Sequence, residues 1–473
     1  MKKKLFAAFI AIVITGCKKN QFETPVLSGV TVPVTVSIDQ SQPGFPVPRS
    51  FEGLSYETGL LIQNPDFLNE DNLVLVQLIK NLGPGILRIG GDTSDEIEWT
   101  GQPRTAATGK DSLTTSDVDR LSAFSKAIGW KVLFGLNLGN NNVKAAVNEA
   151  AYVHNSLQHN LDAFQAGNEP DVFRMKQRYP KYTYNTYQQE WDKYFAAIRA
   201  KVPNAPFSGP DVIPFDPEWI LAFAKNEGKN VKLIAGHYYR TGPASNDAIT
   251  YHHILEPSAK LPGYLLQLRK ISEHYRIPYR ITEGNSVYGG GKPGVSDVFA
   301  SALWALDFMW NIAENRGQGI NFHGGGKRFA YTPIVMDNGL VSARPEYYAM
   351  LAFSYGAGGG SVIPATIVDP RVSNNCSVYA SVKPDQTYTV TLVNKEDSKN
   401  FAFTIQLSKT ASSIQVFRLE APSITSTTGT TFAGSTVNSD GTFDPLSTGR
   451  ITVNSKNFVV NVPAGSAAVV TVH

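Results

Sequence analysis

The chain has 473 residues, of which 42% are hydrophobic and 18% are charged. This balance excludes an intrinsically disordered protein, and the length leaves room for two or three domains. The formal net charge is +3, and loss of the three lysines at positions 2–4 with a leader would bring it to zero. A near-neutral protein gives no case for nucleic-acid binding.

Residues 1–17 predict a lipoprotein signal peptide: three lysines precede an apolar run that is too short to span a bilayer, and the run ends in the sequence ITGC. This ending resembles a bacterial lipobox, which implies cleavage before Cys17 and lipidation of its thiol; an ordinary signal peptide is the alternative. We expect a periplasmic or surface-exposed envelope protein that meets the membrane only through this anchor. Cys376 is the one other cysteine, so no internal disulfide is expected. Residues 18–29 read as a polar tether.

The middle of the chain alternates strand and helix patterns, and this predicts a (β/α)8 TIM barrel over residues 47–355. A doubly wound open sheet is the alternative, but no glycine-rich dinucleotide fingerprint follows the first strand. We expect strands at residues 51–56, 85–90, 131–138, 161–167, 206–209, 232–238, 279–283 and 319–323. The clearest helical patterns cover residues 72–82, 117–128, 187–201, 263–275, 297–315 and 345–355.

The end of the chain, residues 356–473, has short alternating runs separated by turn signals, and this predicts an antiparallel β-sandwich domain. Its runs are residues 376–382, 388–393, 401–407, 413–419, 451–453, 458–462 and 467–472. Residues 30–38 also alternate. Within an N-terminal segment of residues 30–46, we expect this strand to fill an open edge of the sandwich.

Two carboxylates follow apolar strands. Glu169 ends the stretch LDAFQAGNEP, and Glu283 ends the stretch PYRITE. In a barrel, the carboxyl ends of the strands form the catalytic face. Glycoside hydrolysis uses two such groups, one as general acid and one as nucleophile or base. The alternative without a catalytic role is a strand followed by a polar turn in each case.

Four segments resemble glycoside hydrolase family 79, the family of β-glucuronidases and heparanase. They are LGPGILRIGGDTSD (82–95), QAGNEPD (165–171), GHYY (236–239) and ITEGNSVYGGGKPGVSD (281–297), and the resemblance covers residues 30–473. It implies that Glu169 is the acid/base, that Glu283 is the nucleophile, and that no metal or cofactor takes part. Asp92 departs from this pattern, because asparagine is usual there. The resemblance also points to glucuronic acid as the sugar that is cleaved.

Several further residues are expected at the sugar. Tyr239, Tyr288 and Tyr331 each follow or lie near a strand end, and a phenol can donate a hydrogen bond to a carboxylate. The amides of Gly289 and Gly290 would complete an anion nest for the C5 carboxylate. Packing with a solvated hydroxyl is the alternative for each tyrosine.

Asn168 is expected to bind a substrate hydroxyl, with capping of the backbone as its alternative, and Asn137 is placed similarly at the third strand's end. Lys292 and Arg328 could add positive charge or face solvent. Arg88 must be paired inside a barrel, so we expect it to support Glu283 or Glu169. Either His237 or Tyr238 is expected to hydrogen-bond Glu283.

The sequence thus predicts a retaining exo-β-glucuronidase that removes terminal glucuronic acid, with or without a 4-O-methyl group, from a carbohydrate. An endo-acting enzyme on glycosaminoglycans is the alternative within enzymes, weakly disfavoured by the near-neutral charge. A non-catalytic glycan-binding lipoprotein is the alternative outside them, although both glutamates are present. The oligomeric state is left open.

Overall fold

The structure, a computed structural model, describes residues 29–473 except 177, 179, 214–216, 327–328, 370, 372–374 and 447–448. The expected signal peptide, Cys17 and Arg328 therefore lie outside the described residues. Among the helices that the structure describes, none is both long and apolar enough to cross a membrane.

Eight parallel strands form a closed barrel, in which the last strand pairs with the first. In chain order they are β3 (Gly53–Glu57), β4 (Ile86–Gly90), β7 (Lys131–Leu136), β8 (Leu161–Ala166), β9 (Phe207–Val212), β10 (Leu233–Thr241), β11 (Tyr279–Val287) and β12 (Ile320–Gly324). The predicted barrel is confirmed. Because parallel strands end on the same side, the carboxyl ends of all eight share one face.

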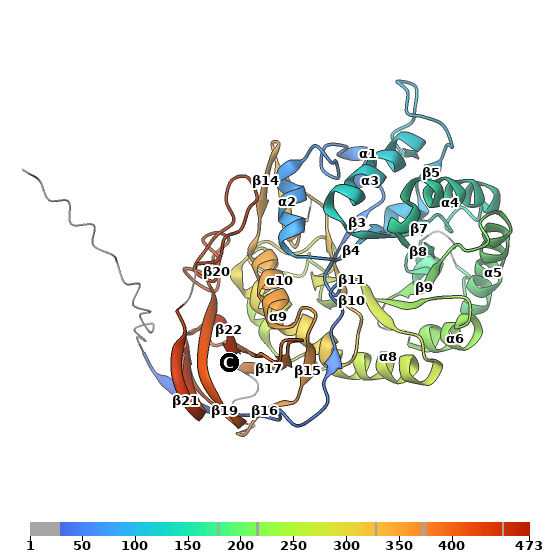
Figure 1. Ribbon diagram of the computed structural model, residues 1–473. Coiled ribbons are helices and arrows are strands. Elements are labelled where there is room, and N and C mark those ends of the chain that lie inside the picture. Colours follow the sequence, from blue (N-terminus) through green and yellow to red (C-terminus); the bar gives the residue numbers. More distant parts are fainter. Residues whose placement is uncertain are drawn as a thin grey trace, which may run out of the picture.

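Helices between the strands cover the outside of the barrel (Figure 1). They are α1 (Leu60–Gln63), α2 (Leu73–Asn81), α3 (Thr115–Ile128), α4 (Val143–Leu157), α5 (Tyr184–Lys201), α6 (Pro217–Glu227), α7 (Tyr251–Leu255), α8 (Leu261–Tyr275), α9 (Phe299–Glu314) and α10 (Pro345–Gly356). Short elements in the loops are β5 (Glu98–Trp99), β6 (Ser112–Leu113), β13 (Ile334–Asp337), β14 (Leu340–Ala343) and the 3₁₀ turns η1 (Asp92–Asp95), η2 (Gln158–Asn160) and η3 (Pro170–Met175).

Local sequence explains where these helices start and stop. Before α3, Thr114 accepts a hydrogen bond from the amide of Asp117, whose carboxylate accepts the amide of Thr114 in return. Such a capping box satisfies two amides that have no partner within the helix. The helix ends at Gly129, whose φ of +73° is easily adopted by glycine. Each helix thereby delivers the next strand to the barrel at a defined point.

The end of the chain forms a ten-stranded sheet that folds over on itself. Its strands are β15 (Ser361–Ile363), β16 (Ala365–Ile367), β17 (Cys376–Val382), β18 (Tyr388–Asn394), β19 (Asn400–Glu420), β20 (Thr431–Phe432), β21 (Ile451–Val462) and β22 (Ser466–Val472), with β1 (Thr31–Ile38) and β2 (Phe45–Pro46) from the start of the chain. A buried apolar cluster that includes Val36, Phe403 and Val470 fills the sandwich. The C-terminal β-sandwich is confirmed.

The long strand β19 organises this sandwich. Its first part pairs with β1 in parallel and with β21 in antiparallel fashion, and its last part pairs with β22. The register shifts between Gln406 and Ala411, where the strand passes from one side of the sandwich to the other. The sequence had suggested two short strands here, at residues 401–407 and 413–419. Figure 1 shows the blue strand β1 beside the red strands of the C-terminal domain.

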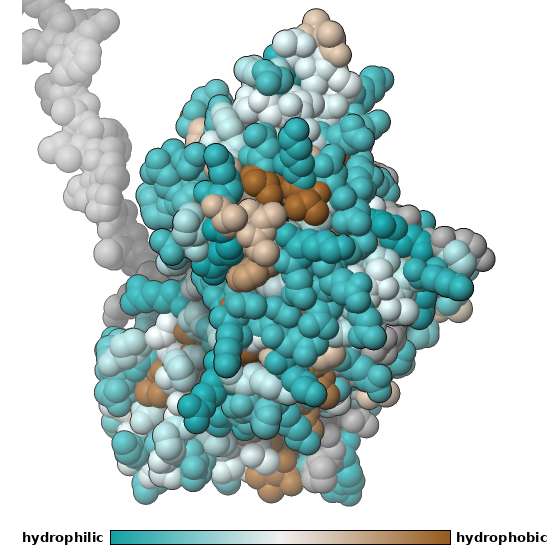
Figure 2. Space-filling model, turned by 90° about the vertical axis from the view of Figure 1, so that its right-hand side faces the viewer, coloured by the Kyte–Doolittle hydropathy of each residue, from teal (hydrophilic) through white to brown (hydrophobic). Residues whose placement is uncertain are grey.

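Helices α9 and α10 join the barrel to the sandwich. The ring of Trp310 in α9 stacks on that of Tyr379 in β17, with ring centres 5.3 Å apart. The hydroxyl of Tyr379 donates to Asp307 at 2.6 Å. Both rings belong to the main buried cluster of the molecule, so barrel and sandwich share one core. The barrel side of the surface is mostly hydrophilic, with a hydrophobic patch in the upper half of the view and smaller hydrophobic areas in the lower half (Figure 2).

Candidate active site

Glu169 and Glu283 come together from two parts of the barrel, Glu169 just after β8 and Glu283 from within β11. β8 ends at Ala166, and the chain then turns so that Glu169 adopts a left-handed conformation with φ of +49° just before η3. Glu283 lies within β11 and is buried. A carboxylate oxygen of Glu169 lies within 4.8 Å of one of Glu283. The structure thus brings together the two residues that the sequence singled out.

Glu283 is held as an ionised carboxylate by two hydrogen bonds and a nearby imidazole. Arg88 donates to its Oε2 at 2.7 Å, the hydroxyl of Tyr239 donates to its Oε1 at 2.7 Å, and Nδ1 of His323 lies 3.7 Å from Oε2. Burial would raise the pKa of Glu283, but the charges of His323, His237 and Arg88 and the hydrogen bond from Tyr239 hold it well below its usual range. A carboxylate that stays ionised suits a nucleophile.

Arg88 is the centre of a buried polar network and is 1% exposed. Besides Glu283, it donates to Asp211 at 2.5 Å, to Asn168 at 2.8 Å and to Gln165 at 2.9 Å. These acceptors satisfy a charge that would be costly to bury alone. Of the two roles expected for Arg88, the structure shows direct contact with Glu283.

His237 contacts Glu169 and does not contact Glu283 through a hydrogen bond. Its Nδ1 lies 2.9 Å from Glu169 Oε1, and its Nε2 lies 3.1 Å from Asp211 Oδ1. Burial would lower the pKa of His237, but the neighbouring charges of Asp211 and Glu283 and the contacts with Asp211 and Glu169 raise it to about 10. Near neutral pH, both ring nitrogens therefore carry protons, and Nδ1 donates to Glu169.

The expectation that His237 or Tyr238 would bond Glu283 is wrong. Tyr238 points to the other side of its strand, as alternation along β10 requires, and its hydroxyl contacts Ser258 at 2.9 Å. The next side chain on the inner face, Tyr239, makes the bond.

The two glutamates are linked by a continuous chain of alternating charges: Glu283, Arg88, Asp211, His237 and Glu169. Asp211 lies at the middle. Burial would raise its pKa, but the charges of Arg88 and His237 lower it to about 2. Each cation thus has an anion on both sides, which offsets the cost of burying so many charges.

The loop after β4 adapts to its unusual Asp92. The carboxylate of Asp92 accepts from Nδ2 of Asn168 at 3.2 Å and pairs with Lys176 at 2.7 Å. Asp95 accepts the backbone amide of Asn168 at 2.7 Å. Asn168 is therefore fixed by Arg88, Asp92 and Asp95, and one hydrogen of its Nδ2 is left for a substrate hydroxyl.

The three tyrosines converge beside Glu283. The ring centre of Tyr239 lies 6.0 Å from that of Tyr331 and 6.4 Å from that of Tyr288. Tyr331 is buried, whereas Tyr288 is 42% exposed at the rim. Because Tyr239 donates to Glu283, its hydroxyl is engaged with a catalytic carboxylate, and it is also in hydrogen-bond contact with the hydroxyl of Tyr331.

The glycine loop after β11 lies against the segment that carries Tyr331. Gly289 and Gly290 have φ of +85° and +95°, conformations that glycine adopts readily. The carbonyl of Gly290 accepts the amide of Ala330 at 2.6 Å, which places the loop next to Tyr331. The amides of Gly289 and Gly290 have no protein acceptor among the described residues, whereas the amide of Gly291 donates to Val287.

Two other expected residues do not reach the carboxylates. The side chain of Asn137 donates to the carbonyl of Ile97 at 2.8 Å and accepts the amide of Asn140 at 2.9 Å, so it braces loops. Lys292 donates to the carbonyl of Asn246 at 2.7 Å, outside the site.

The sequence reasoning missed Asp211, Gln165, Glu57 and His323. His323 lies 3.5 Å from Glu57, the last residue of β3, and bridges it to Glu283. All four lie in or at the ends of barrel strands. A search of every strand end for polar side chains would have found Glu57 and His323 by the criterion that selected Glu169.

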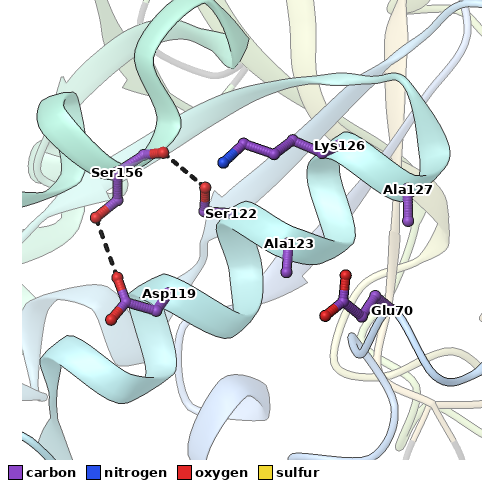
Figure 3. A pocket seen from close by; sticks show the side chains of 7 residues that line it. All are labelled: Glu70, Asp119, Ser122, Ala123, Lys126, Ala127 and Ser156. Atoms are coloured by element: carbon purple, nitrogen blue, oxygen red, sulfur yellow. Dashed lines mark hydrogen bonds between the residues drawn. The ribbon is translucent and has the colours of Figure 1, made fainter.

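One cavity on the molecule lies away from the active site. It has a volume of about 610 Å³ and lies between α3 and α4 on the outside of the barrel (Figure 3). Its polar groups pair with one another: Ser122 donates to the carbonyl of Ser156, and the Ser156 hydroxyl donates to Asp119. None of its lining residues is one of the catalytic candidates.

Glu169, His237 and Glu283 are also the one group of acidic, histidine or cysteine side chains in the described part of the chain whose spacing suits a metal ion. A protonated imidazole has no free lone pair for a metal. With its pKa raised to about 10 by the surrounding carboxylates, His237 fits the ion-pair chain better than a ligand set.

Comparison with known proteins points to glycoside hydrolases. Residues 376–469 match the glycosyl hydrolase family 79 C-terminal beta domain. The chain is 24% identical to a β-glucuronidase of Aspergillus niger, with 86% of each chain covered, and 25% identical to mouse heparanase over 41% of this chain and 37% of that protein.

The C-terminal domain matches that of glycoside hydrolase family 79, and the chain is similar to a β-glucuronidase over most of its length. It is therefore a glycoside hydrolase, in agreement with the resemblance seen in the four sequence segments. Among solved structures, a 4-O-α-L-rhamnosyl-β-D-glucuronidase from Fusarium oxysporum shares the fold, with a TM-score of 0.78, 20% identity and coverage of 92% of this chain and 100% of that one.

Proposed function

We propose that this glycoside hydrolase is a retaining exo-β-glucuronidase that removes terminal β-linked glucuronic acid, with or without a 4-O-methyl group, from glycans or glycosides. The approach of the Glu169 and Glu283 carboxylates to within 4.8 Å carries the proposal. Retaining glycosidases hold their carboxyl groups about 5–5.5 Å apart, whereas inverting enzymes leave about 6.5–9.5 Å for a water molecule. The β-glucuronidase relatives support the choice of sugar.

In the first step, Glu283 attacks C1 of the sugar while Glu169 gives a proton to the glycosidic oxygen. The bond between C1 and the glycosidic oxygen breaks, and a covalent bond between C1 and Glu283 forms. Arg88 and Tyr239 hold the attacking carboxylate in place through both of its oxygens. In the second step, Glu169 takes a proton from water, the water oxygen bonds to C1, and Glu283 leaves. The product keeps the β configuration.

Glu169 reaches the substrate with one oxygen. Its Oε1 accepts from His237, whereas Oε2 has no hydrogen-bond partner among the described residues. The free oxygen is the one that can hold and deliver the proton. His237 fixes the orientation of the carboxyl group because Asp211 anchors the imidazole from its other nitrogen.

The sugar carboxylate would bind where Tyr331, Tyr288 and the free amides of Gly289 and Gly290 converge. These are uncharged donors, and they suit an anion beside Glu283 because amides and hydroxyls make an anion nest without a further cation. Binding there would seat C5 next to the wall formed by Tyr239, with C1 facing Glu283.

The test is a panel of aryl β-glycosides. The glucuronide, glucoside and xyloside differ in the substituent at C5, whereas the galacturonide and the 4-O-methyl glucuronide keep the C5 carboxylate and differ from the glucuronide at C4. We expect the glucuronides to be cleaved fastest, and NMR of the first product to show the β anomer. Glu283→Gln should abolish turnover, and azide should rescue Glu169→Ala on activated substrates. An α product, or cleavage restricted to internal bonds of glycosaminoglycans, would contradict the proposal.

We also propose that the protein is a lipoprotein of the bacterial cell envelope. The motivation is the ITGC sequence that ends at Cys17. Replacement of Cys17 by Ser should release the protein from membranes or block its processing. A mature N-terminus at any other residue would contradict this assignment.

A further inference from the structure

A second cavity, of about 380 Å³, lies on the catalytic side of the barrel. Its walls are β5, the loop between β7 and α4, and the first two turns of α4. Trp99, Asn137, Asn140, Asn142 and Glu149 line it, together with apolar side chains. No residue of the catalytic network belongs to it.

The cavity adjoins the active site through shared loops. Asp95, which fixes the amide of Asn168, also accepts the amides of Leu138 and Gly139 at 2.8 Å and 2.9 Å. Asn137, the residue before Leu138, lines the cavity and ties its two walls together through its bond to the carbonyl of Ile97. The same turn therefore borders both sites.

Glu149 is the unusual feature of this cavity. It is only 5% exposed, yet no hydrogen bond or ion pair joins its carboxyl group to another residue of the described chain. Some buried acids of the protein are paired, such as Asp117 with Arg104 and Arg120, whereas the carboxyl oxygens of Glu52 and Asp171 also lack a hydrogen-bond partner. Of these three unpaired acids, only Glu149 lines this cavity. A buried polar group without a protein partner is costly unless a ligand or water satisfies it.

The chemistry of Glu149 favours a neutral partner. Burial raises its pKa to about 8, so it keeps its proton at neutral pH and can both donate and accept. Within the described residues, Glu149 belongs to no group of acidic, histidine or cysteine side chains whose spacing suits a metal ion. A cation is therefore not the ligand that this cavity suits, and a hydroxyl group is.

The remaining walls add an aromatic face and amides. Trp99 is half-buried; its Nε1 donates to Asn148 at 2.7 Å, and Tyr152 packs against it with ring centres 5.6 Å apart. The ring is thus fixed before any ligand arrives. Asn142 uses its Oδ1 to cap α4, which leaves its Nδ2 as a donor. A rigid aromatic ring with several donors and acceptors matches a molecule that has apolar faces and many hydroxyls.

We propose that this cavity binds neutral sugar units of the aglycone, so that the enzyme reads the glycan beyond the glucuronic acid it removes. The proposal rests on the exo-β-glucuronidase function above. An exo enzyme holds the terminal sugar in its catalytic pocket, and the rest of the chain can extend only on the leaving-group side. The rest of the glycan chain would lie along the loops that border both sites, from Asn168 toward Trp99.

The test compares two substrates: an aryl β-glucuronide, which has no sugar aglycone, and a β-glucuronyl oligosaccharide with three neutral sugars. Trp99→Ala and Glu149→Leu should each raise KM for the oligosaccharide by roughly two- to tenfold, as expected for the loss of one neutral contact. Both should leave the aryl substrate unchanged. Glu149→Gln keeps a donor and an acceptor and should behave as wild type. Glu96→Gln, an exposed acid on the same loop, is the matched control.

An unchanged ratio of the two substrates in both Trp99→Ala and Glu149→Leu would overturn the proposal. A second measurement does not depend on turnover or on these variants' stability: saturation-transfer NMR of the neutral trisaccharide with the Glu283→Gln protein, with and without Trp99→Ala. Loss of transfer in the double variant supports the cavity, and equal transfer overturns it. If the wild type cleaves neither glucuronide, the proposed function fails while this binding experiment still judges the cavity.

Discussion

Substitution of Tyr239 can distinguish a tyrosine that positions the nucleophile from one that binds the sugar. The hydroxyl of Tyr239 donates to Glu283 at 2.7 Å, so Tyr239→Phe removes one charged hydrogen bond from the nucleophile. Such a bond contributes about 1.5–3 kcal/mol, which corresponds to a loss of roughly ten- to a hundredfold in kcat/KM. Because the bond goes to the enzyme's own carboxylate, the loss should be the same for an aryl β-glucuronide and for the slower β-xyloside, which has no C5 substituent.

Tyr331→Phe is the matched comparison. Tyr331 lies next to Tyr239 and the glycine loop, and we expect its hydroxyl to serve the sugar carboxylate. This variant should lower kcat/KM for the glucuronide by a similar factor and spare the xyloside. Tyr239→Phe should also move the acidic limb of the pH profile upward, because the hydrogen bond from Tyr239 helps to lower the pKa of Glu283. If Tyr239→Phe affects the glucuronide alone, the assignment of its hydroxyl to the nucleophile is wrong.

Three further changes test the network, the buried acid and the sandwich. Asp211→Asn removes the shared partner of Arg88 and His237; we expect a loss of about 3–5 kcal/mol in the free energy of unfolding and, since the pKa of His237 falls, a basic limb of kcat/KM at lower pH. An unmoved basic limb would argue against this role. Glu149 has its pKa raised from 4.5 to about 8, so its contribution to stability is present below pH 4.5 and is lost as the pH rises to about 8, by about 1.4 kcal/mol per unit. Glu149→Gln should therefore show a stability advantage that grows with pH in denaturant titrations, and a constant difference would refute the burial effect. Deletion of residues 29–40 removes β1, and amide exchange should then quicken in residues 400–407 of β19 more than in the barrel strands, whereas equal protection would show that β1 is dispensable.

Much of the fold could be predicted because the strands carry clear signals at their ends. Each barrel strand is a short apolar run that stops at a turn residue, and eight such runs with helical spacers leave few alternatives. The fifth strand shows the limit. Pro210 suggested an end at Gly209, but β9 continues through it to Val212. Proline lacks only the donor, and the strand pairs through its other groups.

Because β9 was expected to end at Gly209, the sequence did not indicate Asp211, the residue at the centre of the buried charge network. Asp211 comes directly after Pro210 and takes φ of +63°, which turns its side chain toward Arg88 and His237. Nothing in its immediate sequence marks it, because its partners lie on four other strands, β4, β8, β10 and β11. Glu169 and Glu283 could be found from their strand ends alone, whereas a residue whose role depends on contacts between distant strands needs the assembled barrel.

The pairing of β1 with β19 also sets an order of events during synthesis. β1 ends at Ile38, and the first residue of its partner, Asn400, is made more than three hundred residues later. At translation rates of about 5–20 residues per second, β1 waits for roughly 20–70 seconds. During this time an alternating apolar strand has no edge to join and is open to pairing with other chains. The barrel can close meanwhile, because all of its strands lie between β1 and β19 in the sequence. The pairing of β1 with β19 is therefore a late step in folding, and a chain truncated before β19 would leave β1 without this partner.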